Sequence, residues 1–528
     1  MGLKENIYRI RTGAGLTQVK FAEKFGVSHQ SVQKWESGES KPDLENVIRI
    51  ARTFGVSVDC LLFDSNTRTE EELPQNKKLV PTYDGAHRWE LYCEDLECEY
   101  QQSFEEGLDI AEYEDLFRTV AKLSNNEHKR QMADVLFDII LNARMRADYP
   151  YNEPSELDAI KALRVPCDTV LGEADTKTLR DKVAGAWYGR ICGCLLGKPL
   201  EGIRSGELDL FLKGSGNYPL HRYLQASDIT QDVIDKYKFP FSGRVGCCAD
   251  RIECAPVDDD TNYTVLYQRI VDRCGKDFAS LDVARAWLQY QPKNAYCTAE
   301  RVAFCNFVKG YMPPDSAAYQ NPYREWIGAQ IRADYFGYIN PGNPEMAAEM
   351  AWRDASVSHV KNGIYGEMFA AAMIAAAAVC DDTVEIIRCG LAQIPATSRL
   401  YEAIERLLAR YRDGVTETEC FRDIQNRWDD YNQHHWCHTI SNAEIVVAAL
   451  LYGKNGFAES ICIAVQAGFD TDCNGATVGS IMGMKNGVAS IGADWIAPLH
   501  GVQDTSIFGV GRVSIESLID QTVRHIEG

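Results

Sequence analysis

The sequence predicts an all-α protein with a small N-terminal helical module, an acidic helical middle segment and a large C-terminal helical bundle. Two observations favour this class. Apolar residues recur at helical spacing along most of the 528 residues, and no run of alternating β-branched residues indicates a substantial sheet. At about 100–200 residues per domain, the length suggests about three domains.

Composition excludes several classes of protein. A chain with 45% hydrophobic residues can bury a large core, which excludes wholesale disorder. The net charge of −21 excludes a general polyanion binder, so any contact with nucleic acid must be local. The longest apolar run, Met368–Cys380, is shorter than the roughly 20 residues of a membrane span, so it predicts a buried Ala-rich helix and no membrane partner.

Cysteine usage and the N-terminus bear on the compartment. The eighteen cysteines are scattered and include no CxxC pair, which favours reduced, mostly buried thiols. The first residues contain no apolar segment of the kind that directs secretion. A cytoplasmic location is therefore expected.

Residues 1–63 differ from the rest in charge. They carry nine Lys/Arg against seven Asp/Glu, whereas the remainder of the chain carries −23. Thr17, Ser28 and Asp43 each precede an apolar-periodic stretch, as helix N-caps do. We therefore expect five short helices, at Lys4–Thr12, Thr17–Phe25, Ser28–Ser37, Asp43–Phe54 and Val56–Phe63.

The second and third of these helices, joined at Gly26, have the order of a helix-turn-helix motif. Val27, Val32 and Trp35 should pack inward. The opposite face of the third helix presents residues that can read or hold DNA: His29, Gln30, Gln33 and Lys34. The module resembles the Cro/C1-type helix-turn-helix family, which implies binding of double-stranded DNA through residues 1–63, as a homodimer. The alternative is a generic helical bundle.

The next two segments connect this module to the bundle. Residues 64–83 are polar, contain two prolines and are interpreted as a linker. Residues 84–115 hold twelve acidic residues and one arginine, yet apolar residues still recur at helical spacing. We therefore expect an acidic amphipathic helix pair, followed by continuous helix over 116–145, in a middle segment that spans 84–150.

The remainder, residues 178–528, is almost wholly helical in pattern. Its apolar periodicity predicts helices at Asp181–Leu196, Thr261–Cys274, Asp282–Tyr290, Pro344–Ala351, Gly363–Val379, Ser398–Arg412, Ala443–Tyr452, Ala458–Gly468 and Asn474–Lys485.

Three successive carboxylates, Asp258, Asp259 and Asp260, precede one of these helices. Such a run repels itself unless water or a cation neutralises it. Taken alone, the triplet is compatible with a metal site or with a helix cap.

Two predicted helices carry glycine at every fourth position: Gly185, Gly189, Gly193 and Gly197 in the first, and Gly475, Gly479, Gly483 and Gly487 in the second. An interior glycine costs about 1 kcal/mol relative to alanine, so such a face suggests close approach of another backbone. If the two faces pack antiparallel, Glu201 comes near Asp470 and Asp472. The alternative is that each face packs on some other helix.

These carboxylates are hard oxygen donors without an accompanying Cys/His cluster. Such a set suits Mg²⁺ or Mn²⁺ better than zinc, and it is large enough for two ions.

Taken in order, the glycine helix ending in LGKPLEG, the acidic triplet followed by Thr261, and GFDTDCNGATVGSIMG resemble the ADP-ribosylglycohydrolase family. The resemblance implies an all-α orthogonal bundle with two Mg²⁺ ions (Mn²⁺ being possible). It also implies hydrolysis of the bond between ADP-ribose and an acceptor. By position, Asp258, Asp259, Asp260, Asp470 and Asp472 would be metal ligands.

Two further roles follow from the resemblance. Glu201 would be the catalytic acid or base and would also contact ligand, with Asp259 a second catalytic residue, and His359 would lie in the ligand pocket. Two positions depart from the family pattern. Asp258 stands where threonine is common, and Cys473 stands where a second threonine is common. A neutral thiol is a poor ligand for Mg²⁺, so a water or backbone oxygen would have to fill that coordination position.

Two functions therefore follow from the sequence. The first is a metal-dependent hydrolase of an ADP-ribosyl substrate fused to a sequence-specific DNA-binding domain. The second is a transcription regulator whose C-terminal domain only senses an ADP-ribose-like ligand, because a fold alone does not fix function.

Overall fold

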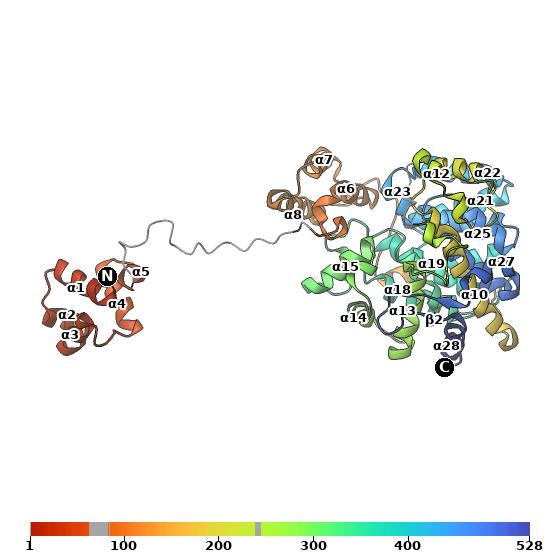
Figure 1. Cartoon of the computed structure of the whole chain (residues 1–528). Helices are drawn as coiled ribbons and strands as arrows, with labels where there is room; N and C mark the ends of the chain where they lie inside the picture. The colour runs from red at the N-terminus through yellow and green to blue at the C-terminus, as the bar shows by residue number, and fades with distance from the viewer. Residues whose placement is uncertain (1, 63–82, 84, 238–243) are drawn as a thin grey trace. The chain divides into compact units, whose positions relative to one another are not determined.

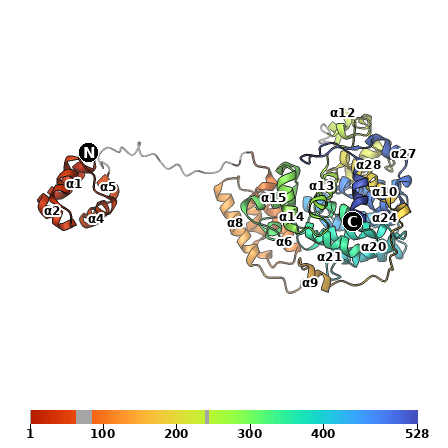
Figure 2. The same ribbon diagram turned by 90° about the horizontal axis from the view of Figure 1, so that it is seen from below.

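The computed structural model describes residues 2–62, 83, 85–237 and 244–528, and the predicted linker, apart from Tyr83, lies outside them (Figures 1 and 2). The chain divides into two compact units, Met1–Gly85 and Ala86–Gly528. Each unit has a hydrophobic core of its own.

The first unit contains the five expected helices. Thr17, Ser28 and Asp43 act as N-caps, and each side chain accepts a hydrogen bond from a backbone N–H in the first turn. Val32 and Trp35 are buried, while Val27 is half-buried. The helices are α1 (Leu3–Gly13), α2 (Gln18–Phe25), α3 (His29–Ser37), α4 (Leu44–Phe54) and α5 (Val58–Leu62).

The middle segment differs from the expectation in two places. The predicted helix pair over 84–115 is one α-helix flanked by 3₁₀ turns. The predicted continuous helix over 116–145 is interrupted before Asn126, whose side chain caps the second helix. The Ser and Asn side chains at 124–126 can hydrogen-bond to nearby backbone groups, which favours a helix end and a new N-cap over continuous helix. The elements are η1 (Arg88–Glu90), η2 (Tyr92–Glu94), α6 (Leu96–Glu105), η3 (Ala111–Tyr113), α7 (Glu114–Ala121) and α8 (Glu127–Asn142).

All nine helices expected in the C-terminal part are present, and the structure adds others between them. The α-helices are α9 (Leu157–Ala162), α10 (Thr176–Gly197), α11 (Ser205–Gly214), α12 (Gln231–Tyr237), α13 (Asp259–Cys274), α14 (Ser280–Tyr290), α15 (Thr298–Lys309), α16 (Asp315–Ala318), α17 (Asp334–Tyr338), α18 (Pro344–Ala355), α19 (Lys361–Ala377), α20 (Thr383–Leu391), α21 (Arg399–Arg412), α22 (Glu417–Arg427), α23 (Gln433–Cys437), α24 (Thr439–Tyr452), α25 (Phe457–Gln466), α26 (Thr471–Asn486), α27 (Ala493–Ile496) and α28 (Ile515–Glu527).

Sheet structure in the described residues is limited to one antiparallel pair, β1 (Val502–Gln503) and β2 (Val513–Ser514). The Ala-rich helix α19 is buried along nearly its whole length in the core of the second unit. Among the described residues, no helix is both long and apolar enough to span a membrane. The all-α prediction is confirmed.

The two glycine faces pack against each other. A Cβ added at Gly189 would overlap the carbonyl oxygen of Gly479, and one added at Gly193 would overlap that of Gly475. Gly185 meets Gly483 in the same way, and Gly197 meets the backbone of Thr471. The helices α10 and α26 therefore run antiparallel with their backbones in contact, as the four-residue glycine spacing suggested.

This contact predicts a large loss of stability for Gly189→Ala. The added methyl group has no space, so the helices must separate, and we expect a loss of about 2–3 kcal/mol or more in the free energy of unfolding. Chemical denaturation of the full chain measures it. Gly214→Ala is the control, because its Cβ would meet only the Tyr237 hydroxyl at 3.8 Å. Equal stability of the two variants would contradict the close packing.

Candidate active site

The antiparallel glycine contact brings three chain segments together at one end of α10. After α10 the chain continues through η4 (Lys198–Leu200) to Glu201. Asp470 is the N-cap of α26, and Asp258 is the N-cap of α13. The Thr471 hydroxyl donates a hydrogen bond to the Gly197 carbonyl at 2.9 Å, which ties the start of α26 to the end of α10.

The acidic residues of these segments converge on a pocket of about 400 Å³. Four of the predicted site residues line it: Glu201, Asp259, Asp470 and Asp472. Aromatic side chains form much of the remaining wall, namely Trp89, Tyr323, Trp326 and Trp436. The spacing argument that placed Glu201 near Asp470 and Asp472 agrees with this arrangement.

Asp258 and Asp260 are not among the residues that line the pocket, and each is buried with a cation beside it. Lys198 Nζ lies 2.5 Å from Asp258 Oδ2. Arg190 Nη2 lies 3.2 Å from Asp260 Oδ1, and Arg190 also pairs with Asp334 at 2.7 Å. These two carboxylates are therefore paired with cations and do not line the pocket.

His359 is not brought to the pocket. Its side chain is fully buried, its Nδ1 lies 2.8 Å from the Ser358 hydroxyl, and it is not a lining residue. It follows α18 at a turn against the start of α19, where Gly363 packs against its ring. This placement does not support the predicted ligand contact.

The first unit presents the predicted DNA-reading side chains to solvent. His29, Gln30, Gln33 and Lys34 are all exposed on α3, while the opposite face of that helix packs on the core of the unit. This exposed face is the one a helix-turn-helix motif inserts into the major groove.

Comparison with known proteins identifies both units. The ADP-ribosylglycohydrolase family model matches residues 175–528, which is well over half of the chain. The chain belongs to the ADP-ribosylglycohydrolase family. A helix-turn-helix model matches residues 7–59. The protein is therefore an ADP-ribosylglycohydrolase domain fused to a helix-turn-helix DNA-binding domain.

The curated relatives match less than a fifth of the chain, and their names describe transcription regulators. The HTH-type transcriptional activator BcrR of Enterococcus faecalis is 36% identical over 85 residues, which is 16% of this chain and 42% of that protein. The cryptic phage CTXphi transcriptional repressor RstR of Vibrio cholerae is 33% identical over 84 residues, covering 16% and 75%. The SPbeta prophage-derived regulator YonR of Bacillus subtilis is 30% identical over 104 residues, covering 19% and 96%.

A solved structure is similar to part of the chain. It is described as an ADP-ribosylglycohydrolase-related protein complex and is 16% identical, with a TM-score of 0.41, over 66% of this chain and 99% of its own length.

The glycohydrolase domain holds its pocket carboxylates in unusual protonation states. Burial, reinforced by Asp258 and Glu201, raises the pKa of Asp259 to about 8. Burial and Glu201 raise the pKa of Asp470 to about 7. The pKa values of Asp472 and Glu201 are also raised, mainly by burial. Asp258 is the exception. Burial opposes its ionisation, but Lys198, together with hydrogen bonds from the Asp260 backbone and Cys194, lowers its pKa.

Sequence reasoning missed several residues of the glycohydrolase site. Arg190 and Lys198 lie in the glycine-rich segment that ends in LGKPLEG, and a basic residue in an otherwise apolar segment was the signal that could have identified them. His87, Arg88 and Trp89 also line the pocket, although they belong to the middle segment. No local motif marks these three as pocket residues, because only the tertiary fold brings them there.

In the metal-free protein, Asp259→Asn should change how stability depends on pH. Asp259 keeps its proton in the fold up to about pH 8, whereas an unfolded aspartate ionises near 3.8. Between these values the folded state binds more protons, so the free energy of unfolding falls as pH rises. The variant should remove up to about 1.4 kcal/mol per pH unit of this fall.

Urea denaturation in EDTA between pH 5 and pH 8 measures the slope for each variant. Asp494→Asn, at an exposed carboxylate, is the control. If wild type and Asp259→Asn have the same slope, Asp259 does not hold its proton as described.

Proposed function

We propose that the pocket hydrolyses the glycosidic bond of an ADP-ribosyl substrate with the help of two divalent cations, Mg²⁺ or Mn²⁺. One observation carries the proposal. Four carboxylates converge on a pocket, and buried oxygens of Asp472 (Oδ1) and Asp260 (Oδ2) have no hydrogen-bond partner in the described residues. Unpaired buried carboxylate oxygens are costly, and a cation removes that cost.

The donor set fits such ions. Carboxylate oxygens of Asp259, Asp470 and Asp472 would hold them, with Asp258 and Asp260 adjoining, and all are hard ligands. Cys473 has a pKa raised well above its ordinary value by burial, so it stays a neutral thiol and contributes little to binding. Bound Mg²⁺ or Mn²⁺ would neutralise the acidic cluster and orient the ribose hydroxyls.

Glu201 is positioned to move the proton. Its carboxylate lines the pocket, and its Oε2 lies 3.5 Å from Arg244 Nη2. Its raised pKa brings the group closer to neutral pH, where it can accept a proton from water and return it to the leaving group. The pocket carboxylates also face the positive charge that develops on the ribose as the glycosidic bond breaks.

A second candidate function is ligand sensing without turnover. Lys198 already neutralises Asp258 at 2.5 Å, and Cys473 stands next to Asp472 where it adds no charged ligand. Both features reduce the number of carboxylates available to two ions. A regulator that binds ADP-ribose and does not hydrolyse it would keep the same pocket.

Turnover separates the two candidates. The full chain with Mg²⁺ should release ADP-ribose from an ADP-ribosylated arginine, serine or small acceptor, and EDTA should abolish the release. Glu201→Gln should lower kcat by about 100-fold or more, because it removes the proton-transfer group. Asp259→Asn combined with Asp472→Asn should lose the rise in Tm that Mg²⁺ gives the wild type.

The control is Glu207→Gln, a carboxylate on α11 that does not line the pocket. Binding of ADP-ribose without release from any of the three substrate classes would favour the sensing function. Identical melting curves in EDTA and Mg²⁺ would contradict the metal site.

We propose that the helix-turn-helix unit binds a specific double-stranded operator as a homodimer. The exposed His29, Gln30, Gln33 and Lys34 support this assignment. Gln30→Ala combined with Gln33→Ala should reduce discrimination between operator and random DNA, because glutamine reads adenine. Lys34→Ala should weaken both complexes, and a phosphate contact would lower the salt slope by about one.

Gel shifts or fluorescence anisotropy at several salt concentrations measure these effects. Arg52→Ala, at an exposed cation of α4, is the control. If full-length protein binds no DNA more tightly than random sequence, specific recognition is wrong.

A further inference from the structure

One wall of the active-site pocket comes from outside the family domain. His87, Arg88 and Trp89 line the pocket, yet the family match begins at residue 175. They belong to the middle segment 84–150, which from Ala86 on is part of the same compact unit as the glycohydrolase domain. In both views α6 and α8 lie close to α15 (Figures 1 and 2). The pocket is incomplete without this segment.

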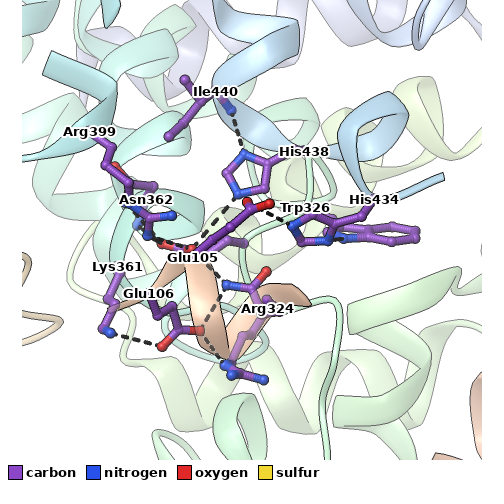
Figure 3. Close-up of polar contacts among 12 residues, drawn as sticks. Glu105, Glu106, Arg324, Trp326, Lys361, Asn362, Arg399, His434, His438 and Ile440 are labelled. Atoms are coloured by element: carbon purple, nitrogen blue, oxygen red, sulfur yellow. Dashed lines mark hydrogen bonds and ion pairs between the residues drawn. The ribbon is translucent and has the colours of Figure 1, made fainter. Parts of the chain in front are cut away.

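Buried ion pairs fix the middle segment on the domain (Figure 3). Arg324 pairs with Glu99 at 2.9 Å and with Glu106 at 2.6 Å, and Lys361 pairs with Glu106 at 2.8 Å. Glu99, Glu106 and Arg324 are all buried. Removing one partner would leave a buried charge without its counter-ion, so this contact is strongly specified.

Two histidines of this interface accept hydrogen bonds through Nδ1. Trp326 Nε1 donates to His434 Nδ1 at 3.0 Å, and the Ile440 N–H donates to His438 Nδ1 at 3.1 Å (Figure 3). His434 Nε2 lies 3.2 Å from Glu105 Oε2, and His438 Nε2 lies 3.8 Å from Glu325 Oε2. The contact between His434 and Glu105 adds to the ion pairs that join the middle segment to the domain.

The turn η1 is held in place by its own contacts. Glu90 pairs with Lys293 at 2.6 Å, and the guanidinium of Arg301 lies over the Trp89 ring at 4.9 Å from its centroid. Arg88 Nε donates to Asp95 at 3.2 Å, and Asp95 also accepts a hydrogen bond from the Tyr323 hydroxyl. The wall is therefore preorganised and does not depend on a ligand to order it.

Two cations line a pocket whose other charges are carboxylates. The Arg88 side chain is 59% exposed although it pairs with Asp95. Arg204 Nη2 donates to Gln433 Oε1 at 3.0 Å, and its buried Nη1 has no hydrogen-bond partner in the described residues. The Arg204 guanidinium stacks on Trp436, 5.0 Å from the ring centroid. Arg88 donates Nε and Nη2 to Asp95, and Arg204 donates Nη2 to Gln433, so each guanidinium would bind a ligand through its remaining N–H groups. Charged guanidinium N–H groups are well suited to bind phosphate oxygens.

We propose that the middle segment is a substrate-recognition wall, in which Arg88, together with Arg204, binds the diphosphate of the ADP-ribosyl group. This inference rests on the proposed function and adds to it that the pocket selects phosphorylated ribosyl substrates. Arg88 is the distinguishing element because the family domain does not supply it. Trp89 positions the wall by stacking on Arg301.

Arg88→Ala tests the proposal in the full chain. Isothermal titration with ADP-ribose in the presence of Mg²⁺ should show affinity lowered about 10- to 100-fold, the usual effect of losing a charge-assisted contact. Arg118→Ala is a matched control. Arg118 lies in the same segment, its side chain is also 59% exposed, it also has a carboxylate partner, and it lines no part of the pocket.

A second variant and a second measurement guard against misfolding. Arg88→Lys keeps the charge but loses the guanidinium fork, so its affinity should be intermediate. The rise in Tm that Mg²⁺ produces should be the same in wild type and Arg88→Ala, because Arg88 is not a metal ligand.

Each outcome bears on a different claim. Wild-type affinity for ADP-ribose in Arg88→Ala would overturn the recognition wall and leave the proposed function intact. Failure of the wild type to bind ADP-ribose would overturn the proposed function, and with it the claim that Arg88 binds a diphosphate. A similar loss of affinity in Arg118→Ala would show a general charge effect and would also overturn the wall.

Discussion

The active site depends on direct contact between two helix backbones. Glycine at every fourth position removes side chains from the facing stripes of α10 and α26, so carbonyl oxygens of one helix lie against α-carbons of the other. Because Glu201 follows α10, and Asp470 and Asp472 begin α26, their separation is set by the backbones. Sites built on helices are held more precisely than sites built on loops.

The cost of this arrangement is electrostatic. The contact gathers carboxylates at the ends of three helices, and burial makes their ionisation unfavourable. The fold offsets part of the cost by placing Arg190 and Lys198, both from the α10 region, beside Asp260 and Asp258. The pocket carboxylates that have no such counter-ion keep their protons or require a cation. The α10 region thus helps to assemble the carboxylate cluster and, through Arg190 and Lys198, also determines which carboxylates remain available to bind a cation.

The sequence was informative wherever a local rule decides structure. Thr17, Ser28 and Asp43 identified helix starts because an N-cap is a local hydrogen bond, and the four-residue glycine spacing identified a helix pair because only backbone contact explains it. Continuous helix over 116–145 was wrong because Asn126 caps a new helix there. Arg88 could not be found as a pocket residue, since its position depends on how the whole middle segment docks.

A repeat of period four has a further consequence, which is ambiguity of register. Sliding α26 along α10 by one repeat would again oppose glycine to glycine, after a displacement of about 6 Å at 1.5 Å per residue. The glycine faces alone cannot distinguish these alignments. The ends of the helices can. The Thr471 hydroxyl must reach the Gly197 carbonyl, and Asn442 must accept hydrogen bonds from both the Asp470 N–H and Asn474. These polar contacts beside the pocket fix the register of α26. The residues that flank the acidic cluster therefore select the one helix alignment in which the cluster forms.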